Sequence, residues 1–320
     1  MKETINGVPV FKTHIKPEEA GKQLNEYLAG RFTYYTKEVW EEKISLNRIL
    51  VSGEYADPSY LLQAGDSLSF FTEDFYEPEV DQNFHILFED EFFFAVEKSG
   101  NLPVHPAGRY QEHNLLTVLK KAGKESLYII NRLDRETSGL VLFAKQKEYT
   151  HKFSSLFGDR KVEKTYIVYV HGDFPDEYLA RGYLQTDTQS KIRKKQTFSE
   201  ISEEGVFSET FFQKIGYGKG ISKVLAFPKT GRLHQIRASL HSIGFPVYGD
   251  KIYGKSEQVF LEFIQKGEDI FKEDWISELC PGKRQALHAH KLSFVHPFTK
   301  GAILLESPEP EDMKGILDRS

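Results

Sequence analysis

The chain has 320 residues, of which 39% are hydrophobic and 28% are charged, a composition typical of a globular protein rather than a disordered one. This length is enough for one large domain and one small domain. The formal net charge of −5 disfavours indiscriminate binding to nucleic acid but leaves room for a local basic groove. The single cysteine, Cys280, excludes an intramolecular disulfide and a zinc site built on cysteine pairs.

The sequence also lacks the marks of a membrane or secreted protein. The first residues do not contain the apolar run of a signal peptide, and no stretch approaches the ~20 apolar residues of a membrane span. We therefore expect a cytoplasmic protein that has no membrane partner.

The N-terminal quarter reads as a unit of its own. We expect residues 1–11 to be a tail and residues 12–75 to form a small domain. Two segments carry apolar residues at helical spacing, residues 18–32 and residues 37–47, and short apolar runs separated by turn residues follow them, as in a strand meander. The acidic stretch at 76–85, which contains Pro78, is expected to be a linker.

From residue 86 onward the pattern changes to short β-rich runs, such as EFFFAVEK and EKTYIVYVHG, separated by helical stretches such as NLLTVLKKAG and LHQIRASLHSIG. There is neither strict βαβ alternation nor a repeat of fixed period. We therefore predict the α+β class. Residues 86–310 would form a domain with a large, mainly antiparallel or mixed β-sheet and flanking helices, beside a small α/β N-terminal domain, and residues 311–320 would be a C-terminal tail.

One segment, YIINRLDRETSGLVLFAK, places a polar run between two strand-like runs. In that run Asp134 lies between Arg132 and Arg135. Nearby cations lower the pKa of a carboxyl group, so Asp134 should stay ionised, which suits a nucleophile or a base better than a general acid. From these residues alone, a solvated ion pair in a surface turn is an equally good interpretation.

Five ordered motifs decide between these interpretations. RLDRETSGL resembles H-R-L-D-x-x-T-S-G-L, the central motif of the RluA-type pseudouridine synthase family. The other four motifs are HILFEDEFFFAVEKSGNLPVHPAG, the K-x-Y at residues 164–166, KTGRLHQIRASLHSIGFPVYGDKIYG and LHAHKLSFVHPFTKG. Together they span residues 86–305, and ordered motifs are far more specific than any single one.

The resemblance implies an isomerase that converts uridine to pseudouridine in RNA and needs no cofactor. Asp134 takes the place of the family's essential aspartate, and Tyr166 matches the tyrosine that packs against the target base. Arg237 matches the arginine that pairs with the catalytic carboxylate, so its loss should damage catalysis more than folding. Arg132 matches the arginine that helps to hold RNA with the target base flipped out. The other residues expected to bind the substrate are Lys164, Lys191, Arg193, Lys194, Arg232, His234 and Gln235.

Some positions depart from the family pattern. Asn131 replaces the usual histidine of the central motif, and Glu97 and Ser99 replace the asparagine and proline of N-K-P-x-G. The N-terminal domain resembles the S4-type RNA-binding domain, with GKQLNEYL in place of G-x-R-L-D-x-F-L. The resemblance implies structured RNA as the partner of a monomeric enzyme. Ribosomal RNA is favoured over transfer RNA because an S4-like domain is more usual in ribosomal members.

Three other functions stay open at this point: a non-catalytic RNA-binding or ribosome-assembly factor that retains the fold, a tRNA-directed synthase, and a glycosidase-like hydrolase. The hydrolase would need paired carboxylates, which are not evident. His288 and His290 would share a strand face near His296, but no carboxylate at ligand spacing accompanies them, so we expect no metal site. The glycine-rich run 216–220 lacks the spacing of a phosphate loop and is expected to be a hairpin turn.

Overall fold

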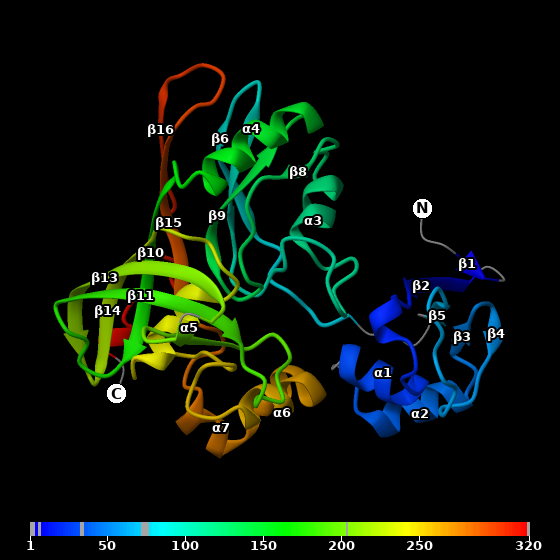
Figure 1. Cartoon of the computed structure of the whole chain (residues 1–320). Helices are drawn as coiled ribbons and strands as arrows, with labels where there is room; N and C mark the ends of the chain where they lie inside the picture. The colour runs from blue at the N-terminus through cyan, green and yellow to red at the C-terminus, as the bar shows by residue number, and fades with distance from the viewer. Residues whose placement is uncertain (1–3, 6–7, 33–34, 72–76, 203, 319–320) are drawn as a thin grey trace. The chain divides into compact units, whose positions relative to one another are not determined.

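A computed structural model describes the chain except for residues 1–3, 6–7, 33–34, 72–76, 203 and 319–320 (Figure 1). The chain divides into two compact units. The first comprises Met1–Pro78 with Ala107–Arg109, and the second comprises Glu79–Pro106 with Tyr110–Ser320. No helix among the described residues is both long and apolar enough to cross a bilayer.

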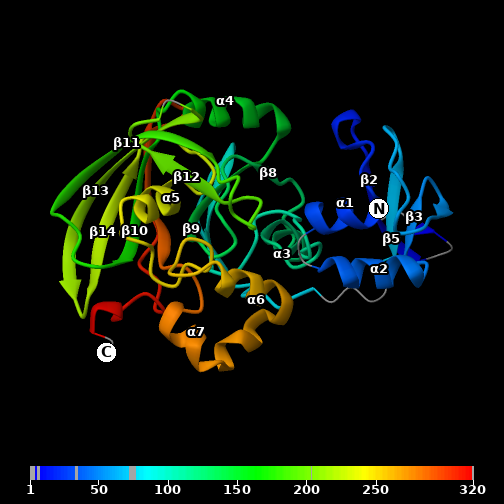
Figure 2. The same cartoon turned by 60° about the horizontal axis from the view of Figure 1, so that its bottom comes forward.

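The first unit is a sheet with the strand order β1-β2-β5-β3-β4 and two helices. Its elements are β1 (Thr4–Ile5), β2 (Val8–His14), η1 (Pro17–Glu19), α1 (Leu24–Arg31), α2 (Lys37–Ser45), β3 (Ile49–Val51), β4 (Glu54–Tyr55) and β5 (Ser67–Phe71). Leu24 and Leu28 of α1, four residues apart and so on one helix face, are buried in one cluster with Trp40 of α2 and Leu68 of β5. The two helices lie side by side in Figure 2.

Three predicted boundaries of this region change. The expected tail of residues 1–11 overlaps β2, which pairs with β5. The predicted helix at 18–32 begins only at Leu24, because Gly21 adopts a positive φ of 83°, which an α-helix does not accommodate. Residue 76 of the expected linker at 76–85 lies outside the described residues, and Phe84 already begins a strand.

The second unit contains one mixed sheet, to which eleven strands contribute in the described part of the chain. Its strands are β6 (Phe84–Glu89), β7 (Phe93–Lys98), β8 (Tyr128–Ile129), β9 (Ser138–Ala144), β10 (Glu163–His171), β11 (Glu177–Thr186), β12 (Gln196–Ser199), β13 (Val206–Gly218), β14 (Ile221–Pro228), β15 (Leu287–Val295) and β16 (Ala302–Glu306). The order is β12-β11-β13-β14-β10-β15-β9-β7-β6, with β16 on β15 and β8 on β9. The β15–β9 pair is parallel and the others are antiparallel, so the predicted α+β class is confirmed.

Helices cover both faces of this sheet. They are α3 (Leu115–Lys121), α4 (Lys147–Gly158), α5 (Gln235–Ser242), α6 (Gln258–Lys266) and α7 (Asp274–Leu279), with the 3₁₀ turns η2 (Gly267–Lys272) and η3 (Ile316–Asp318). Val141 of β9 is buried with Leu119 of α3, whereas its neighbour Leu142 is buried with Phe153 of α4. Successive strand residues face opposite sides, so β9 is buried along its whole length.

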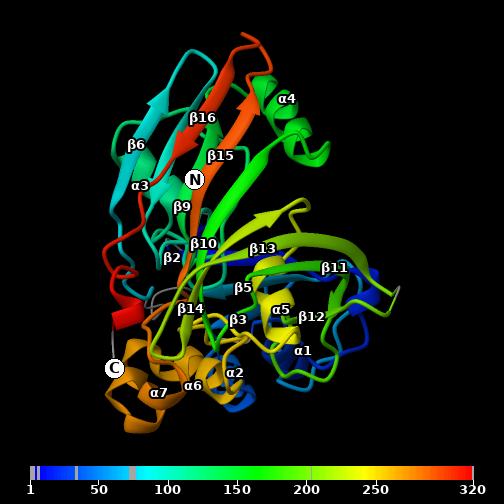
Figure 3. The same cartoon turned by 90° about the vertical axis from the view of Figure 1, so that its left-hand side faces the viewer.

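The other half of the sheet curls around α5 (Figure 3). Ile236 and Leu240 of this helix are buried with residues of β10, β11, β13 and β14, and burying such side chains contributes about 1.5–3 kcal/mol each. Met313 and Ile316 are buried with residues of β10 and β14. Met313, Ile316 and Leu317 of the expected tail at 311–320 therefore pack against the sheet.

Two turns are important here. One confirms a prediction from the sequence, and the other positions the segment before β9. The run 216–220 is the β13–β14 hairpin, in which Lys219 and Gly220 both have positive φ, as a two-residue type I′ turn requires. At the start of β9, Gly139 has a φ of 108°, and a Cβ there would lie 2.2 Å from the carbonyl oxygen of Ala289. Only glycine permits this approach. It joins β9 to β15 and places the segment before β9 at the centre of the sheet.

Candidate active site

Asp134 sits in a tight turn just before β9, and the backbone of that turn is held from several sides. The Thr137 N–H donates to the Asp134 carbonyl at 3.1 Å, and the Arg135 carbonyl accepts from the Leu102 N–H at 3.0 Å. The same carbonyl accepts from Nζ of Lys98 at 3.1 Å. Lys98 is fully buried, and its burial lowers its pKa well below the usual range. The turn is therefore rigidly placed.

Asn131 closes the other end of the turn. Its Nδ2 donates to the Leu140 carbonyl at 3.3 Å, and its Oδ1 accepts from the Leu142 N–H at 2.8 Å. Both partners are backbone groups of β9, so the side-chain amide forms the pair of hydrogen bonds that the backbone of a neighbouring strand would form. The residue that replaces the family's histidine thus has its hydrogen bonds satisfied within the fold.

Arg237 of α5 connects this turn to the opposite half of the sheet. Its Nη1 donates to Oδ2 of Asp134 at 2.9 Å, and its Nε and Nη2 donate to Oδ2 and Oδ1 of Asp250 at 2.6 Å and 2.8 Å. The side chains of Arg237 and Asp250 are 5% and 0% exposed, whereas that of Asp134 is 29% exposed. The bidentate pair with Asp250 fixes the guanidinium plane, which leaves one N–H to hold the more accessible carboxylate.

The electrostatics keep all three groups charged. Burial raises the pKa of Asp134, but the charge and the hydrogen bond of Arg237 outweigh it and hold that pKa below the ordinary value. Burial opposes ionisation of Asp250 in the same way, and Arg237 with the N–H groups of Ile252 and Tyr253 again lowers the pKa. The two carboxylates raise the pKa of Arg237 in spite of its burial. Asp134 is therefore an oriented carboxylate at neutral pH.

Tyr166 lies on β10, within electrostatic reach of Asp134. The pairing of β10 with β15 shifts register between Thr165 and Tyr166, and such a bulge can redirect a side chain beside a functional site. Burial, together with the charge of Asp134, raises the pKa of Tyr166 to about 12. The ring is partly buried against the core around α5, and its phenol is neutral at physiological pH.

His234 precedes α5 and joins the same cluster. Its backbone is left-handed, with φ 55° and ψ 19°, which is uncommon for a residue with a side chain. Its Nε2 lies 4.0 Å from Oδ1 of Asp134, and its side chain is 8% exposed. Its Nδ1 lies 2.9 Å from Oη of Tyr253. Burial, followed by the charge of Arg237, lowers the pKa of His234 to about 4, so the imidazole is neutral.

Gln235, which the sequence suggested as a substrate-binding residue, is buried and directs its side-chain amide into the fold. Its Oε1 accepts from Oγ1 of Thr230 at 2.7 Å and from the Arg232 N–H at 3.0 Å. Its Nε2 donates to the Glu209 carbonyl at 3.0 Å and to Oγ1 of Thr210 at 2.9 Å. All four hydrogen-bonding positions of the amide are used, so Gln235 fixes the segment before α5.

We expect Gln235→Ala to destabilise the second unit by about 2–4 kcal/mol, because it leaves buried polar partners unsatisfied. The RNA affinity of the folded protein should stay unchanged. Thermal unfolding and filter binding, measured on the same preparation, check this prediction. A fall in RNA affinity without a fall in melting temperature would restore the substrate-binding role.

Two further predicted RNA contacts are also tied to the backbone. Nζ of Lys164 donates to the Thr230 carbonyl at 2.9 Å, and burial and neighbouring cations lower its pKa to about 8. Nε of Arg232 donates to the Phe207 carbonyl at 3.3 Å, and its side chain is largely exposed. Lys164 therefore supports the 229–234 segment, whereas Arg232 remains accessible.

Two of the basic residues expected to bind RNA, Arg132 and Lys194, act on the histidines His105 and His234. Arg132 is exposed, and its Nη1 lies 3.5 Å from Nε2 of His105. After burial, the charges of Arg132 and Lys194 are the main causes that lower the pKa of His105, and Lys194 also acts on His234. Lys191 and Arg193 are exposed on the same loop as Lys194, but no contact brings them to the carboxylate.

Sequence reasoning missed the acidic anchor of Arg237. Asp250 and Lys251 lie in the motif KTGRLHQIRASLHSIGFPVYGDKIYG, but the sequence alone gives no role for either residue. Asp250 binds Arg237, and Nζ of Lys251 donates to Oε1 of Glu136 at 2.9 Å. This dipeptide thus binds side chains on both sides of the turn that contains Asp134. Its only sequence signal was an acid–base pair directly after a glycine.

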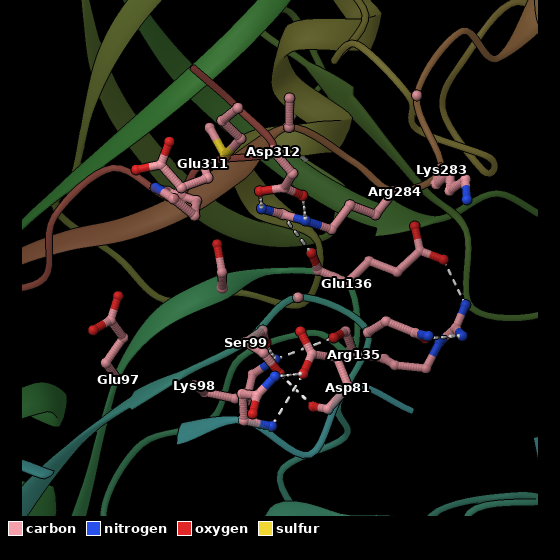
Figure 4. A pocket seen from close by; sticks show the side chains of 18 of the residues that line it. Asp81, Glu97, Lys98, Ser99, Arg135, Glu136, Lys283, Arg284, Glu311 and Asp312 are labelled. Atoms are coloured by element: carbon pink, nitrogen blue, oxygen red, sulfur yellow. Dashed lines mark hydrogen bonds and ion pairs between the residues drawn. The ribbon is translucent and has the colours of Figure 1, made fainter. Parts of the chain in front are cut away.

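A cavity of 740 Å³ lies on the other side of this turn (Figure 4). Its lining includes Lys98, Arg135 and Glu136 but none of Asp134, Tyr166 and Arg237. Arg284, which also faces it, forms a bidentate pair with Asp312. The acidic and basic side chains labelled around the cavity largely neutralise one another.

No group of three or more His, Cys, Asp or Glu side chains in the described residues is arranged to hold a metal ion. His288 is buried, with Nδ1 2.9 Å from Oγ of Ser138 and Nε2 3.1 Å from the Ser307 carbonyl. His296 is also buried, and its Nδ1 accepts from the Phe298 N–H at 3.1 Å. Both rings therefore serve the core.

Comparisons with known proteins show which class of protein the chain resembles. The sequence model of the RNA pseudouridylate synthase family matches residues 93–242. The chain is 28% identical over 292 residues to an uncharacterized RNA pseudouridine synthase of Synechocystis, which covers 90% of this chain and 94% of that protein. It is 27% identical to ribosomal large subunit pseudouridine synthase D of Buchnera aphidicola, covering 93% of this chain and 94% of that one.

Two other comparisons extend the picture. The mitochondrial tRNA pseudouridine(32) synthase of Saccharomyces cerevisiae is 28% identical, over 85% of this chain and 60% of its own length. The solved structure of human RNA pseudouridylate synthase domain containing 1 superposes with a TM-score of 0.58 at 21% identity, covering 73% of this chain and 87% of that one. This likeness supports the fold.

Over most of its length the chain is similar to RNA pseudouridine synthases, and the model of the RNA pseudouridylate synthase family matches its residues 93–242. The chain is an isomerase that converts uridine to pseudouridine in RNA, as the sequence motifs predicted.

Proposed function

We propose that the chain isomerises a uridine in structured ribosomal RNA, with Asp134 as the catalytic carboxylate. Arg237 would keep that carboxylate ionised and oriented, and the ring of Tyr166 would hold the target base. We also propose that the S4-like N-terminal unit contributes to RNA binding, and that the enzyme works as a cytoplasmic monomer.

The reaction sets clear demands on such a site. The bond between C1′ and N1 breaks, the base turns, and C5 bonds to C1′, after which C5 loses its proton and N1 gains one. Positive charge that develops at C1′ is stabilised by a nearby carboxylate, as in glycoside chemistry. An aromatic ring against the detached base can retain it while excluding water. The target must leave the base stack, because C1′ is inaccessible in a helix.

The observation that carries this proposal is the hydrogen bonding of the Asp134 carboxylate. Among the described residues, Arg237 is the one buried cation that donates a hydrogen bond to it. Arg237 donates to one carboxylate oxygen at 2.9 Å, which leaves the other oxygen, Oδ1, free of a direct hydrogen bond in the described residues and on the side of the neutral His234. RNA binding alone would not require a partly exposed carboxylate that a buried arginine orients. This favours catalysis over the assembly-factor alternative.

Ribosomal RNA is proposed as the substrate on the strength of the S4-like unit, while one relative named above acts on tRNA. To test this, RNA is labelled with [5-³H]uridine in cells that lack the protein, separated into ribosomal and transfer fractions, and incubated with purified enzyme. Tritium released to water measures the reaction, because the C5 hydrogen is lost. Release from the ribosomal fraction is expected. Release from the transfer fraction alone would show that the enzyme is tRNA-directed.

We expect the neutral triple variant K191Q/R193Q/K194Q to bind RNA more weakly and with a smaller dependence on salt. Each lost phosphate contact should lower the slope of log Kd against log salt by about 0.7–0.9. Fluorescence anisotropy over a salt series measures the slope. The matched control replaces the exposed residues Lys121, Lys272 and Lys300. Equal slopes for the two triple variants would remove the 191–194 loop from the RNA interface.

A further inference from the structure

The hydrogen bonds around His234 determine which of its ring nitrogens carries the proton. Tyr253 is fully buried, and its Oη accepts from the Gln196 N–H at 2.8 Å. The buried phenol proton needs an acceptor, and Nδ1 of His234 at 2.9 Å is the one in reach among the described residues. Nδ1 therefore accepts, so in the neutral ring the proton resides on Nε2.

This assignment turns a hydrogen-bond donor toward the catalytic carboxylate. Nε2 faces Oδ1 of Asp134 at 4.0 Å, on the oxygen that Arg237 does not bind. At 4.0 Å the contact is not yet a hydrogen bond, and catalytic hydrogen bonds commonly tighten when the substrate binds. The left-handed backbone of His234 is a strained conformation of the kind that is retained at functional sites.

We propose that His234 is a positioning residue for Asp134. Its Nε2–H limits rotation of the carboxylate, and the tautomer is set by a relay from the Gln196 N–H through the Tyr253 hydroxyl. This inference rests on the proposed role of Asp134 in the reaction. It replaces the RNA-binding role that the sequence suggested for His234.

Neutrality of the ring matters for this role. The charged and titratable groups that face His234 are Asp134, Lys194, Arg237, Asp250 and Tyr253. Burial and the two cations outweigh the two carboxylates, which lowers the pKa of the ring to about 4. An imidazolium would be a second cation on Asp134 and would weaken it as a nucleophile. A neutral donor orients the oxygen without neutralising it.

Two substitutions at this position separate the role from simple packing. In His234→Asn the side-chain amide replaces Nδ1, keeps the Tyr253 contact and tolerates the left-handed backbone, but does not reach Asp134. In His234→Gln the amide nitrogen replaces Nε2 and can donate to Asp134. The single-turnover release of tritium from [5-³H]uridine-labelled total RNA, taken from cells without the protein, should fall about 10²-fold in the first variant. The second variant should recover most of that loss.

The outcomes are distinct. Equal rates in the two variants, whether at the wild-type level or equally reduced, would overturn the positioning role. If Asp134→Asn still released tritium, the proposed function itself would fail. If it did not, while His234→Asn kept the wild-type rate, the inference on His234 alone would fail.

A second measurement starts from the wild-type protein. Wild-type protein with ¹⁵N-labelled histidine rings is expected to show His234 at neutral pH with its proton on Nε2. Tyr253→Phe should redistribute that proton between the two nitrogens. A proton on Nδ1 in the wild type would overturn the relay.

Discussion

Asp134→Asn is expected to lower the single-turnover rate of uridine isomerisation by about 10⁴-fold or more, the scale seen when a reacting side chain is removed. Asparagine has almost the same shape, and its Oδ1 can still accept from Nη1 of Arg237. The guanidinium keeps its bidentate pair with Asp250. The melting temperature and the RNA affinity should therefore hardly change.

Tritium release from labelled RNA and differential scanning calorimetry measure the two quantities. The control is Asp312→Asn, which removes a similarly charged group from a bidentate arginine pair away from Asp134, at Arg284. This control should leave the rate unchanged. Substantial turnover in Asp134→Asn would show that another group carries out the chemistry.

Arg237→Met should cost both activity and stability, because two carboxylates lose their shared cation. Removing one partner from a buried ion pair typically costs about 3–5 kcal/mol, which corresponds to a fall of about 6–20 °C in melting temperature for a unit of this size. This changes the expectation drawn from sequence, in which catalysis would suffer more than folding. The reason is Asp250, whose side chain is fully buried.

The pH dependence of this defect has a definite sign. In the wild type, the lowered pKa values of Asp134 and Asp250 contribute stability above their unfolded values, and that stability is lost as the pH falls through the folded values. Without Arg237, burial raises both folded pKa values instead. The variant should then regain stability relative to wild type as the pH is lowered from 8 to 5.

The double variant Arg237→Met/Asp250→Asn separates the loss of stability from the loss of activity. Neutralising Asp250 should restore part of the melting temperature, while the rate stays low because Asp134 still lacks its cation. The exposed pair of Lys272 with Asp269 supplies a control, since Lys272→Met should change stability by less than about 1 kcal/mol. If Arg237→Met melted like wild type, the buried three-group arrangement would be wrong.

The sequence predicted the fold class and the central pair of the site because both follow from local signals. Alternating apolar residues marked the strands, and a polar run between two strands marked the turn at Asp134. The resemblance to a known family then paired Asp134 with Arg237, 103 residues apart. Neither composition nor spacing alone could have made that connection.

Other features depend on contacts between residues that are far apart in the sequence and meet only in the folded chain. Asp250 could not be assigned because its partner is on another element, and a carboxylate after a turn is ordinarily solvated. Gln235 looked like an RNA ligand because it is polar, yet four backbone and hydroxyl partners surround it. The tautomer of His234 depends on Tyr253 and Gln196, which come from separate parts of the chain.

The most direct test of Asp134 as the catalytic carboxylate is pseudouridine mapping of total RNA from cells with and without this protein. We expect a site in ribosomal RNA that disappears on deletion, returns with the wild-type chain, and does not return with Asp134→Asn expressed at the same level. A site that returns with Asp134→Asn would contradict the assignment of the catalytic group. No lost site in any RNA would contradict the enzymatic role itself and favour a binding function.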